Sequence, residues 1–206
     1  MLFTVVVSHY KENLDWLKTV NSKYIHLYSK GGQQLHKPYK VTYLPNVGRE
    51  PHTYLRYIID YYSTLPQIIV FTQGKDDHLS SKKIDEGIRI LRDSPETKIF
   101  GNIAVKSLHE LHLSDEFRLE SYKGVTLIPA TMNFCDWFLK YVDPTFNFNN
   151  KLSLFYGACF TVRKEQVLRR SKSYYEELMQ QTEVGDSTEV SHFFERSWYY
   201  IFNCHK

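Results

Sequence analysis

The stretch Gln67-Ile68-Ile69-Val70-Phe71-Thr72-Gln73-Gly74-Lys75-Asp76-Asp77-His78 decides the fold. Its apolar, β-branched run from Ile68 to Phe71 is typical of a strand that is buried on both faces of a parallel sheet. Gly74 then permits a tight turn, and two carboxylates and an imidazole follow it. Because ligands of open α/β sheets bind beyond the carboxyl ends of the strands, we expect Asp76-Asp77-His78 at the mouth of a crevice.

Oxygen and imidazole ligands together suit a divalent ion such as Mn²⁺ or Mg²⁺. A divalent ion beside a polar loop commonly serves a phosphate, which makes a phosphate-bearing ligand the first hypothesis. The same three residues are also compatible with a solvated acidic turn that caps the next helix, because such short motifs are weak signals.

The composition describes a soluble globular chain. The 206 residues, 42% hydrophobic and 24% charged, suffice for a single domain, residues 1–206, with its own core. A net charge of +3 without a long run of Lys or Arg argues against a nucleic-acid partner. The aromatic content of 16% suits carbohydrate stacking and core packing equally.

Cysteine usage and hydropathy bear on location. Three cysteines without metal-type spacing fit a reducing compartment, which predicts the cytoplasm. The amino-terminal apolar run reads as a strand rather than a signal peptide, and no apolar run approaches the ~20 residues that span a membrane. Because the chain stops just after a helical pattern, we expect further domains linked to it in a longer protein.

The first half of the chain alternates between strand and helix patterns. Strands are predicted at 2–7, 24–28, 41–44, 68–71 and 99–105, and helices at 13–20, from Pro51 through Tyr62, and from Ser80 or Ser81 to Leu91. This rhythm predicts an α/β fold: a Rossmann-like, mixed but mostly parallel sheet flanked by helices on both faces. Residues 1–105 would form a nucleotide-binding half.

The second half, residues 106–206, is less regular. It predicts a strand at 125–128, a helix at 136–142, a strand pair or a strand bent around Gly157 at 152–162, and helices at 164–179 and 189–202. On the last helix Glu189, His192 and Arg196 share one polar side. That stripe is either a solvated helix face or part of a site.

Two further segments lie at predicted strand ends or helix starts. Ser8-His9-Tyr10 follows the first strand. Arg49 precedes the helix that begins near Pro51, where it is either an anion contact or a structural partner of Glu50.

The Asp-x-His turn after a central strand, with a lone His far downstream, resembles the GT-A glycosyltransferases. Similar order and spacing are found in a less described GT-A-like family that includes the amino-terminal domain of a multidomain chlorella-virus protein. The resemblance spans nearly the whole chain. It is carried by Asn46-Val47-Gly48-Arg49-Glu50, Val70-Phe71-Thr72-Gln73-Gly74, Tyr156-Gly157-Ala158-Cys159-Phe160 and Phe194-Glu195-Arg196-Ser197-Trp198.

The resemblance implies a GT-A-like domain that moves a sugar from a nucleotide-diphosphate sugar, such as a UDP-sugar, to a glycan or another hydroxyl acceptor. For a viral member the compartment would be the host cytoplasm. The implied cofactor is Mn²⁺ or Mg²⁺, held by Asp76, His78 and His192, with Asp77 beside the donor. Because the family's first Asp could align with Lys75 or Asp76, the choice among residues 76–78 stays open.

The same resemblance implies the roles of the donor contacts. Ser8, His9 and Tyr10 would line the base pocket, Arg49 would reach the base or the phosphates, and Gln73 with Gly74 would reach the ribose. Residues 106–206 would form the acceptor-side half, in which Trp137, Tyr156 and the loop 146–150 are candidate sugar contacts.

An inverting reaction needs a carboxylate to deprotonate the acceptor hydroxyl, whereas a retaining reaction can proceed without one. The available carboxylates are Asp136, Asp186, Glu189 and Glu195, and we take Asp136 and Glu189 as the catalytic candidates. Two other functions compete with this one. They are a metal-dependent phosphohydrolase or nucleotidyltransferase, and a non-catalytic nucleotide- or carbohydrate-binding module.

Overall fold

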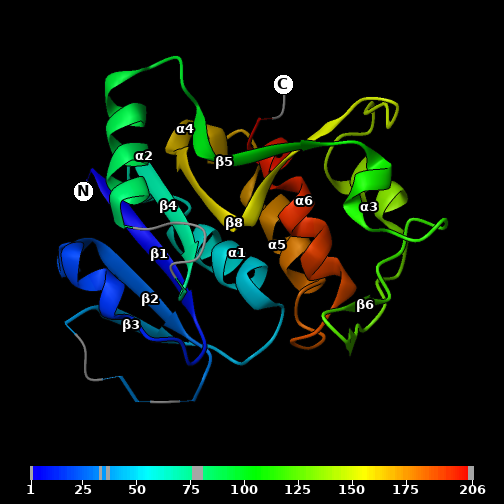
Figure 1. Ribbon diagram of the computed structural model, residues 1–206. Coiled ribbons are helices and arrows are strands. Elements are labelled where there is room, and N and C mark those ends of the chain that lie inside the picture. The colour runs from blue at the N-terminus through cyan, green and yellow to red at the C-terminus, as the bar shows by residue number, and fades with distance from the viewer. Residues whose placement is uncertain (1, 33, 36–37, 76–80, 204–206) are drawn as a thin grey trace.

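The computed structural model describes residues 2–32, 34–35, 38–75 and 81–203 (Figure 1). Its strands are β1 (Phe3–His9), β2 (Ile25–Ser29), β3 (Lys40–Tyr43), β4 (Ile68–Gln73), β5 (Ile99–Lys106), β6 (Ser121–Tyr122), β7 (Val125–Thr126) and β8 (Leu152–Arg163). Its α-helices are α1 (Arg49–Tyr61), α2 (Ser81–Asp93), α3 (Phe134–Tyr141), α4 (Lys164–Val167), α5 (Lys172–Gln180) and α6 (Glu189–Asn203). Three short 3₁₀ helices complete the description: η1 (Asp15–Thr19), η2 (Ser22–Tyr24) and η3 (Leu108–Leu111).

A six-stranded sheet with the order β3-β2-β1-β4-β8-β5 forms the centre of the fold. β1, β2, β3 and β4 pair in parallel, whereas β8 runs antiparallel to both of its neighbours, β4 and β5. Helices pack on both faces of this sheet. The mixed, mostly parallel, Rossmann-like α/β fold predicted from the sequence is therefore confirmed.

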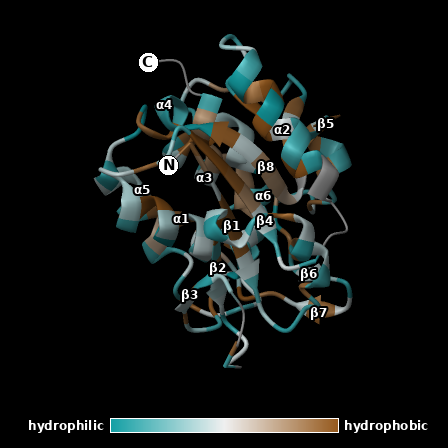
Figure 2. Cartoon of the chain, turned by 90° about the vertical axis from the view of Figure 1, so that its left-hand side faces the viewer, coloured by the Kyte–Doolittle hydropathy of each residue, from teal (hydrophilic) through white to brown (hydrophobic). Residues whose placement is uncertain are grey.

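The two faces of the sheet are buried in two separate cores. In β1 the side chains of Val5 and Val7 belong to the core that also contains residues of α2 and η1, while Val6 between them belongs to the core that contains residues of α1, α3 and α6. β4 alternates in the same way, with Val70 on the α2 side and Phe71 on the α6 side. This alternation explains why the apolar runs predicted buried parallel strands. Figure 2 shows the hydrophobic segments gathered on the central strands between the helices.

Within the described part of the chain, no helix has the length and apolar character needed to cross a lipid bilayer.

Local boundaries differ from the sequence-based expectation in the first half. The helix predicted at 13–20 is only the 3₁₀ helix η1, because Val20 already has extended backbone angles and ends it. Leu14 and Leu17, which suggested an amphipathic helix, are buried all the same.

The second half departs further. The strand predicted at 125–128 shortens to β7, the helix predicted at 136–142 begins at Phe134, and the one predicted at 164–179 splits into α4 and α5. Side-chain caps explain the helix starts: Asn133 accepts a hydrogen bond from the backbone N–H of Asp136, and Ser171 accepts one from that of Tyr174. Of the two arrangements left open for 152–162, the single bent strand, β8, is found.

Buried histidines predict sensitivity to acid. Burial, with the positive charges of nearby residues adding to it, lowers the pKa of His26 and of His52 to about 4. The unfolded chain then binds more protons than the folded one between pH 4 and 6.5, so the free energy of unfolding should fall as the pH drops through that window. Denaturant titrations at several pH values should show that, near pH 5, each histidine lowers the free energy of unfolding by about 1.4 kcal/mol for each pH unit of acidification. His26→Gln should remove the contribution of one histidine to this pH dependence. An unchanged dependence of the free energy of unfolding on pH would contradict the account.

Candidate functional site

A cleft lies at the carboxyl edge of β1 and β4, where the parallel register pairs Ser8 with Gln73. It consists of two adjoining cavities, which share Arg49 and Glu50 as lining residues. The β1 cavity, about 320 Å³, is further lined by Ser8, His9, Tyr10, Glu12, Lys30, Asn46, Asp186 and Ser187. The α6 cavity, about 230 Å³, is further lined by Pro51, Gln73, Lys75, Tyr122, Lys123, Gly157, Ala158, Ser191, His192 and Glu195. Together the two volumes fall within the roughly 300–1,000 Å³ of small-molecule sites.

The segment Ser8-His9-Tyr10 is fixed at the end of β1 by its own contacts. The Ser8 hydroxyl is 2.9 Å from that of Thr53 on α1, and the backbone N–H of Tyr10 donates to the Glu12 carboxylate over 2.7 Å. Ser8 and His9 are buried, whereas Tyr10 is 42% exposed. The Tyr10 ring is therefore the most accessible side chain of this segment.

The end of β4 approaches the same place closely. A Cβ atom on Gly74 would lie 2.6 Å from a carboxylate oxygen of Glu12, so a larger residue there would require the Glu12 side chain to move. The Gly74 carbonyl accepts a hydrogen bond of 2.8 Å from the Trp16 indole. These contacts bring the β1 and β4 ends together at the cleft.

α1 starts in an unusual backbone conformation. Gly48, the residue before the helix, has φ = 58°, and Arg49 itself has φ = 48°, a region that favours glycine. The buried Lys30 side chain donates from Nζ to the carbonyl oxygens of Val47 and Arg49, on either side of this turn. The start of α1 is thus held by Lys30, the residue that directly follows β2.

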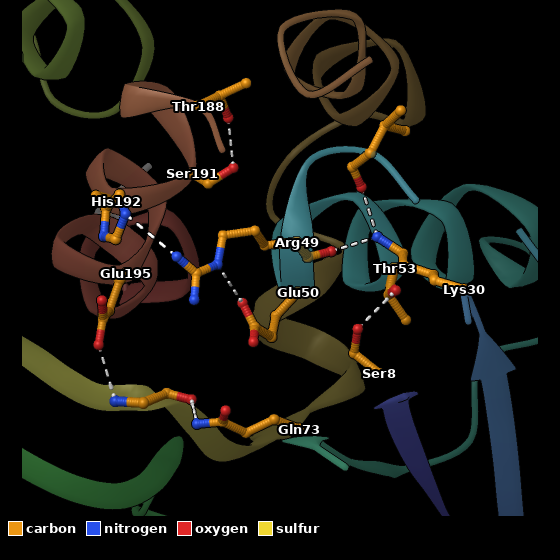
Figure 3. A network of polar contacts seen from close by, with 12 residues as sticks. Ser8, Lys30, Arg49, Glu50, Thr53, Gln73, Thr188, Ser191, His192 and Glu195 are labelled. Atoms are coloured by element: carbon orange, nitrogen blue, oxygen red, sulfur yellow. Dashed lines mark hydrogen bonds and ion pairs between the residues drawn. The ribbon is translucent and has the colours of Figure 1, made fainter. Parts of the chain in front are cut away.

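The Arg49 guanidinium lies between the two halves of the chain (Figure 3). Its Nη1 is 3.3 Å from Nε2 of His192 on α6, and its Nε is 3.8 Å from the Glu50 carboxylate. The guanidinium carbon also lies 5.9 Å from the centre of the Tyr122 ring. Because an arginine can only donate, Nε2 of His192 presents its lone pair to this contact. Arg49 therefore pairs with Glu50 and also lines the cleft, and its role as an anion contact stays a prediction.

His192 is held in its neutral form. Its side chain is 4% exposed, and burial, followed by the charges of Arg49 and Arg196, lowers its pKa to about 3. The Tyr122 ring packs against it at a centroid distance of 4.6 Å. A neutral imidazole is the form in which histidine binds metal ions, and binding through Nε2 requires that the contact with Arg49 is released.

The bend of β8 forms another wall of the α6 cavity. Gly157 and Ala158 have φ values of 66° and 52°, and the pairing of β8 with β5 shifts register beside them. The Gly157 peptide groups are held from two sides: its N–H donates to Glu195 of α6 and its carbonyl accepts from the Gln73 side chain, each over 2.9 Å (Figure 3). Gln73 and Glu195 therefore fix the shape of this wall.

The two carboxylates predicted as catalytic lie elsewhere. Glu189 is 1% exposed, and its oxygens accept hydrogen bonds from Arg118 and from the backbone N–H groups of Leu119 and Ala130. Asp136 is exposed in the first turn of α3 and lines neither cavity of the cleft. Glu189 therefore holds loops together, and the carboxylates that line the cleft within the described residues are Glu12, Glu50, Asp186 and Glu195, while a catalytic role of Asp136 or Glu189 stays a prediction without support from the geometry of the cleft.

The predicted metal motif, Asp76-Asp77-His78, lies outside the described residues. It follows directly after Lys75, which lines the α6 cavity. Among the residues that are described, no group of three or more His, Cys, Asp or Glu side chains could hold a metal ion. His192, the third predicted ligand, lines the α6 cavity, but within the described residues it is not part of a group of three or more side chains that could bind a metal ion.

A sequence model of the family described as "Protein of unknown function (DUF3431)" matches residues 4–206. The chain belongs to the DUF3431 family. A search of curated proteins finds no significant match to this DUF3431 chain.

Two solved structures resemble the DUF3431 chain over most of its length. One is CMP:2-keto-3-deoxy-manno-octonic acid synthetase complexed with CTP, at 8% identity and a TM-score of 0.41, covering 87% of this chain and 84% of that one. The other is 4-diphosphocytidyl-2C-methyl-D-erythritol synthase from Anaerococcus prevotii DSM 20548, at 10% identity and a TM-score of 0.36, covering 96% of both chains. Since both TM-scores lie below 0.5, this likeness carries no inference about what the chain binds or does.

Sequence reasoning missed part of the cleft. Tyr122 and Lys123, in the hairpin of β6 and β7, line the α6 cavity, although the sequence predicts only irregular structure for their segment. The one available signal was the Lys123-Gly124 pair, which predicts a turn but not its position next to His192. Glu50 was considered only as a partner of Arg49, whereas it lines both cavities.

Gly48→Ala is predicted to destabilise the DUF3431 chain strongly. An added Cβ would meet the Thr182 carbonyl oxygen at 2.3 Å, at a point where the Gly48 N–H already donates to the Gly185 carbonyl. The matched control is Gly124→Ala, where φ is +80° and nothing lies within 4 Å, so only the backbone cost of roughly 1–2 kcal/mol applies. Denaturant titrations should show a clearly larger loss for Gly48→Ala. Equal losses would mean that Thr182 does not pack against Gly48.

Proposed function

We propose that this DUF3431 chain is a divalent-metal-dependent glycosyltransferase of GT-A type. It would move a sugar from a nucleotide-diphosphate sugar, with UDP as the first base to test, to a hydroxyl acceptor such as a glycan. The resemblance of its ordered motifs to the GT-A glycosyltransferases supports this reaction class. The cleft at the carboxyl edge of β1 and β4 supports the location of the site.

One observation carries the proposal: Arg49 of the first half meets His192 of the second half at 3.3 Å beside the end of β4. A cation and a neutral imidazole are thus joined in a cavity that also contains Lys75, the residue directly before the predicted metal motif. Cationic groups suit a diphosphate, and a neutral imidazole suits a divalent ion.

The residues fit a metal ion in the chemistry of their donors. His192 supplies a neutral nitrogen, and Asp76, Asp77 and His78 would supply the remaining ligands, since the described residues alone do not form a site. When bound, Mn²⁺ or Mg²⁺ would neutralise charge on the diphosphate and stabilise the leaving nucleotide.

Different residues along the cleft would contact different parts of the donor. Tyr10 would contact the nucleoside in the β1 cavity, with Asp186 and Glu12 available to hydroxyl groups. Arg49 would donate to the diphosphate at the junction of the cavities, where its guanidinium matches phosphate oxygens. The transferred sugar would then lie in the α6 cavity, against the wall formed by Gly157 and Ala158.

If the reaction inverts the anomeric centre, Glu195 is the best-placed general base. One of its oxygens accepts from the Gly157 N–H, which orients the carboxylate within the α6 cavity. Glu195 thereby replaces Asp136 and Glu189 as the candidate for this role.

A panel of nucleotide-sugars tests the proposal. UDP- and GDP-sugars are added to the protein with and without Mn²⁺, and the unfolding temperature and the release of free nucleotide are measured. At about 100 times its Kd, the correct donor should stabilise the fold by roughly 2.7 kcal/mol, and more than the bare nucleotide does. Metal-dependent release of nucleotide should accompany this stabilisation.

Arg49→Ala should lose the donor-specific stabilisation. Arg56→Ala is the matched control, because Arg56 lies on the same helix, pairs with Asp60 and lines neither cavity of the cleft. Stabilisation without turnover, unaffected by metal, would instead identify a binding module.

A further inference from the structure

Lys30, the residue directly after β2, is an unusually buried lysine. Its side chain is 6% exposed, and its Nζ donates to the carbonyl oxygens of Val47, over 2.6 Å, and Arg49. Its own backbone N–H donates to the His9 carbonyl over 2.9 Å, which anchors it to the end of β1. Lysine is seldom buried to this degree because an ammonium ion loses its hydration, so the position calls for a physical reason.

The two carbonyl groups that Lys30 binds flank a strained turn. Gly48 and Arg49 both have left-handed backbone conformations, with φ values of 58° and 48°. Arginine in this region is disfavoured by its Cβ, and such conformations persist only where surrounding contacts determine them. Figure 3 shows the Lys30 side chain reaching the carbonyl oxygen of Arg49, and the Arg49 side chain extending away from that contact toward His192.

We propose that Lys30 is a positioning residue for Arg49: its ammonium binds both carbonyls of the turn and thereby fixes the direction in which the guanidinium enters the cleft. Lys30 also lines the β1 cavity, but its effect on the ligand is proposed to act through Arg49. The consequence for donor binding rests on the proposed function, whereas the effect of Lys30 on the Arg49 side chain does not.

A dependence on pH follows from the surroundings of Lys30. Burial lowers the pKa of Lys30 to about 7, and the nearby carboxylate of Glu50 opposes that effect. The positive charge of Lys30 also lowers the pKa of His52 on α1. The other charged or titratable residues that line the β1 cavity with Lys30 are His9, Glu12, Arg49, Glu50 and Asp186. A neutral amine makes weaker hydrogen bonds to carbonyl groups than an ammonium ion does. Ligand affinity that depends on Arg49 should therefore weaken as the pH rises through about 7.

The first test needs no ligand. The side-chain Nε–H signal of Arg49, assigned with Arg49→Lys, is recorded by NMR in the wild type and in Lys30→Met. The signal should move toward that of a free arginine in Lys30→Met and remain in place in the control Lys40→Met, whose lysine contacts Tyr61 at the opposite edge of the sheet. Circular dichroism checks that each variant is folded, and Lys30→Arg serves if Lys30→Met is not. An unchanged Arg49 signal in a folded variant overturns the inference.

The second test is a double-mutant cycle with UDP and Mn²⁺ as the probe. Lys30→Met should weaken UDP binding about tenfold, within the range of residues that act in one network, and should abolish the loss of affinity between pH 6.5 and 8. In an Arg49→Ala background the same substitution should have no further effect. Additive losses would overturn the inference. If the wild type binds no nucleoside diphosphate, the proposed function fails, and the Arg49 signal alone decides the role of Lys30.

Discussion

Alanine in place of Asp76 or His78 is expected to lower the metal-dependent release of nucleotide from the donor by about 10³-fold or more. In the proposed reaction the ion supplies several kcal/mol of charge stabilisation to the departing diphosphate, and each 1.4 kcal/mol corresponds to a factor of ten in rate. Both variants should also lose most of the Mn²⁺ affinity that isothermal titration measures in the wild type. His192→Ala should weaken the same affinity while leaving residues 76–78 in the chain to bind.

Asp85→Ala is the control for this pair, because Asp85 is an exposed acid on α2, close to the motif in sequence but not among the lining residues of the cleft. It should retain wild-type turnover and metal affinity. Wild-type turnover in Asp76→Ala and His78→Ala would remove the metal motif from the mechanism, and the acidic turn would then be the solvated cap of α2 that the sequence also permits.

Glu189→Ala is expected to lower the free energy of unfolding by about 3–5 kcal/mol. The substitution leaves Arg118 and two backbone N–H groups, those of Leu119 and Ala130, without the carboxylate that accepts from them. Breaking a buried, hydrogen-bonded ion pair from one side costs this much because the remaining polar groups stay desolvated. For a chain of this size, the unfolding temperature should drop by roughly 10 °C.

Two further variants separate the structural role of Glu189 from a catalytic one. Glu189→Gln keeps one acceptor oxygen and should lose less stability than Glu189→Ala, while Glu183→Ala, at an exposed position, should stay within about 0.5 kcal/mol of the wild type. A Glu189→Ala protein with wild-type stability but no turnover would return this residue to the list of catalytic candidates.

The fold was largely readable from the sequence because its central strands are buried on both faces. The continuous apolar runs of β1 and β4 leave few alternatives to a parallel sheet, and the helices that cover it carry regular apolar stripes. The antiparallel course of β8 was not readable, since strand direction depends on the path of the chain between elements rather than on the pattern within one. A bend at Gly157 is one of two arrangements that the sequence allows, whereas the left-handed Ala158 beside it is not predicted.

The site was predictable where it follows strand ends and unpredictable where it depends on side-chain contacts. Ser8, Arg49, Gln73 and Gly74 were placed at one edge because parallel strands end together. His192 was linked to that edge only through the resemblance, and the structure brings it to Arg49. Glu189 shows the opposite case: a carboxylate on a polar helix stripe looked available, and only its three hydrogen-bond donors, which come from a distant loop, reveal that it is occupied.

The most direct test of the central claim is a crystal structure with Mn²⁺ and a nucleotide-sugar donor, with the anomalous signal of manganese used to locate the ion. The account predicts manganese bonded to His192 and to residues from 76–78 in the α6 cavity, with the diphosphate next to Arg49 and the nucleoside in the β1 cavity. An ordered ion and donor bound at any other place on the molecule would contradict it.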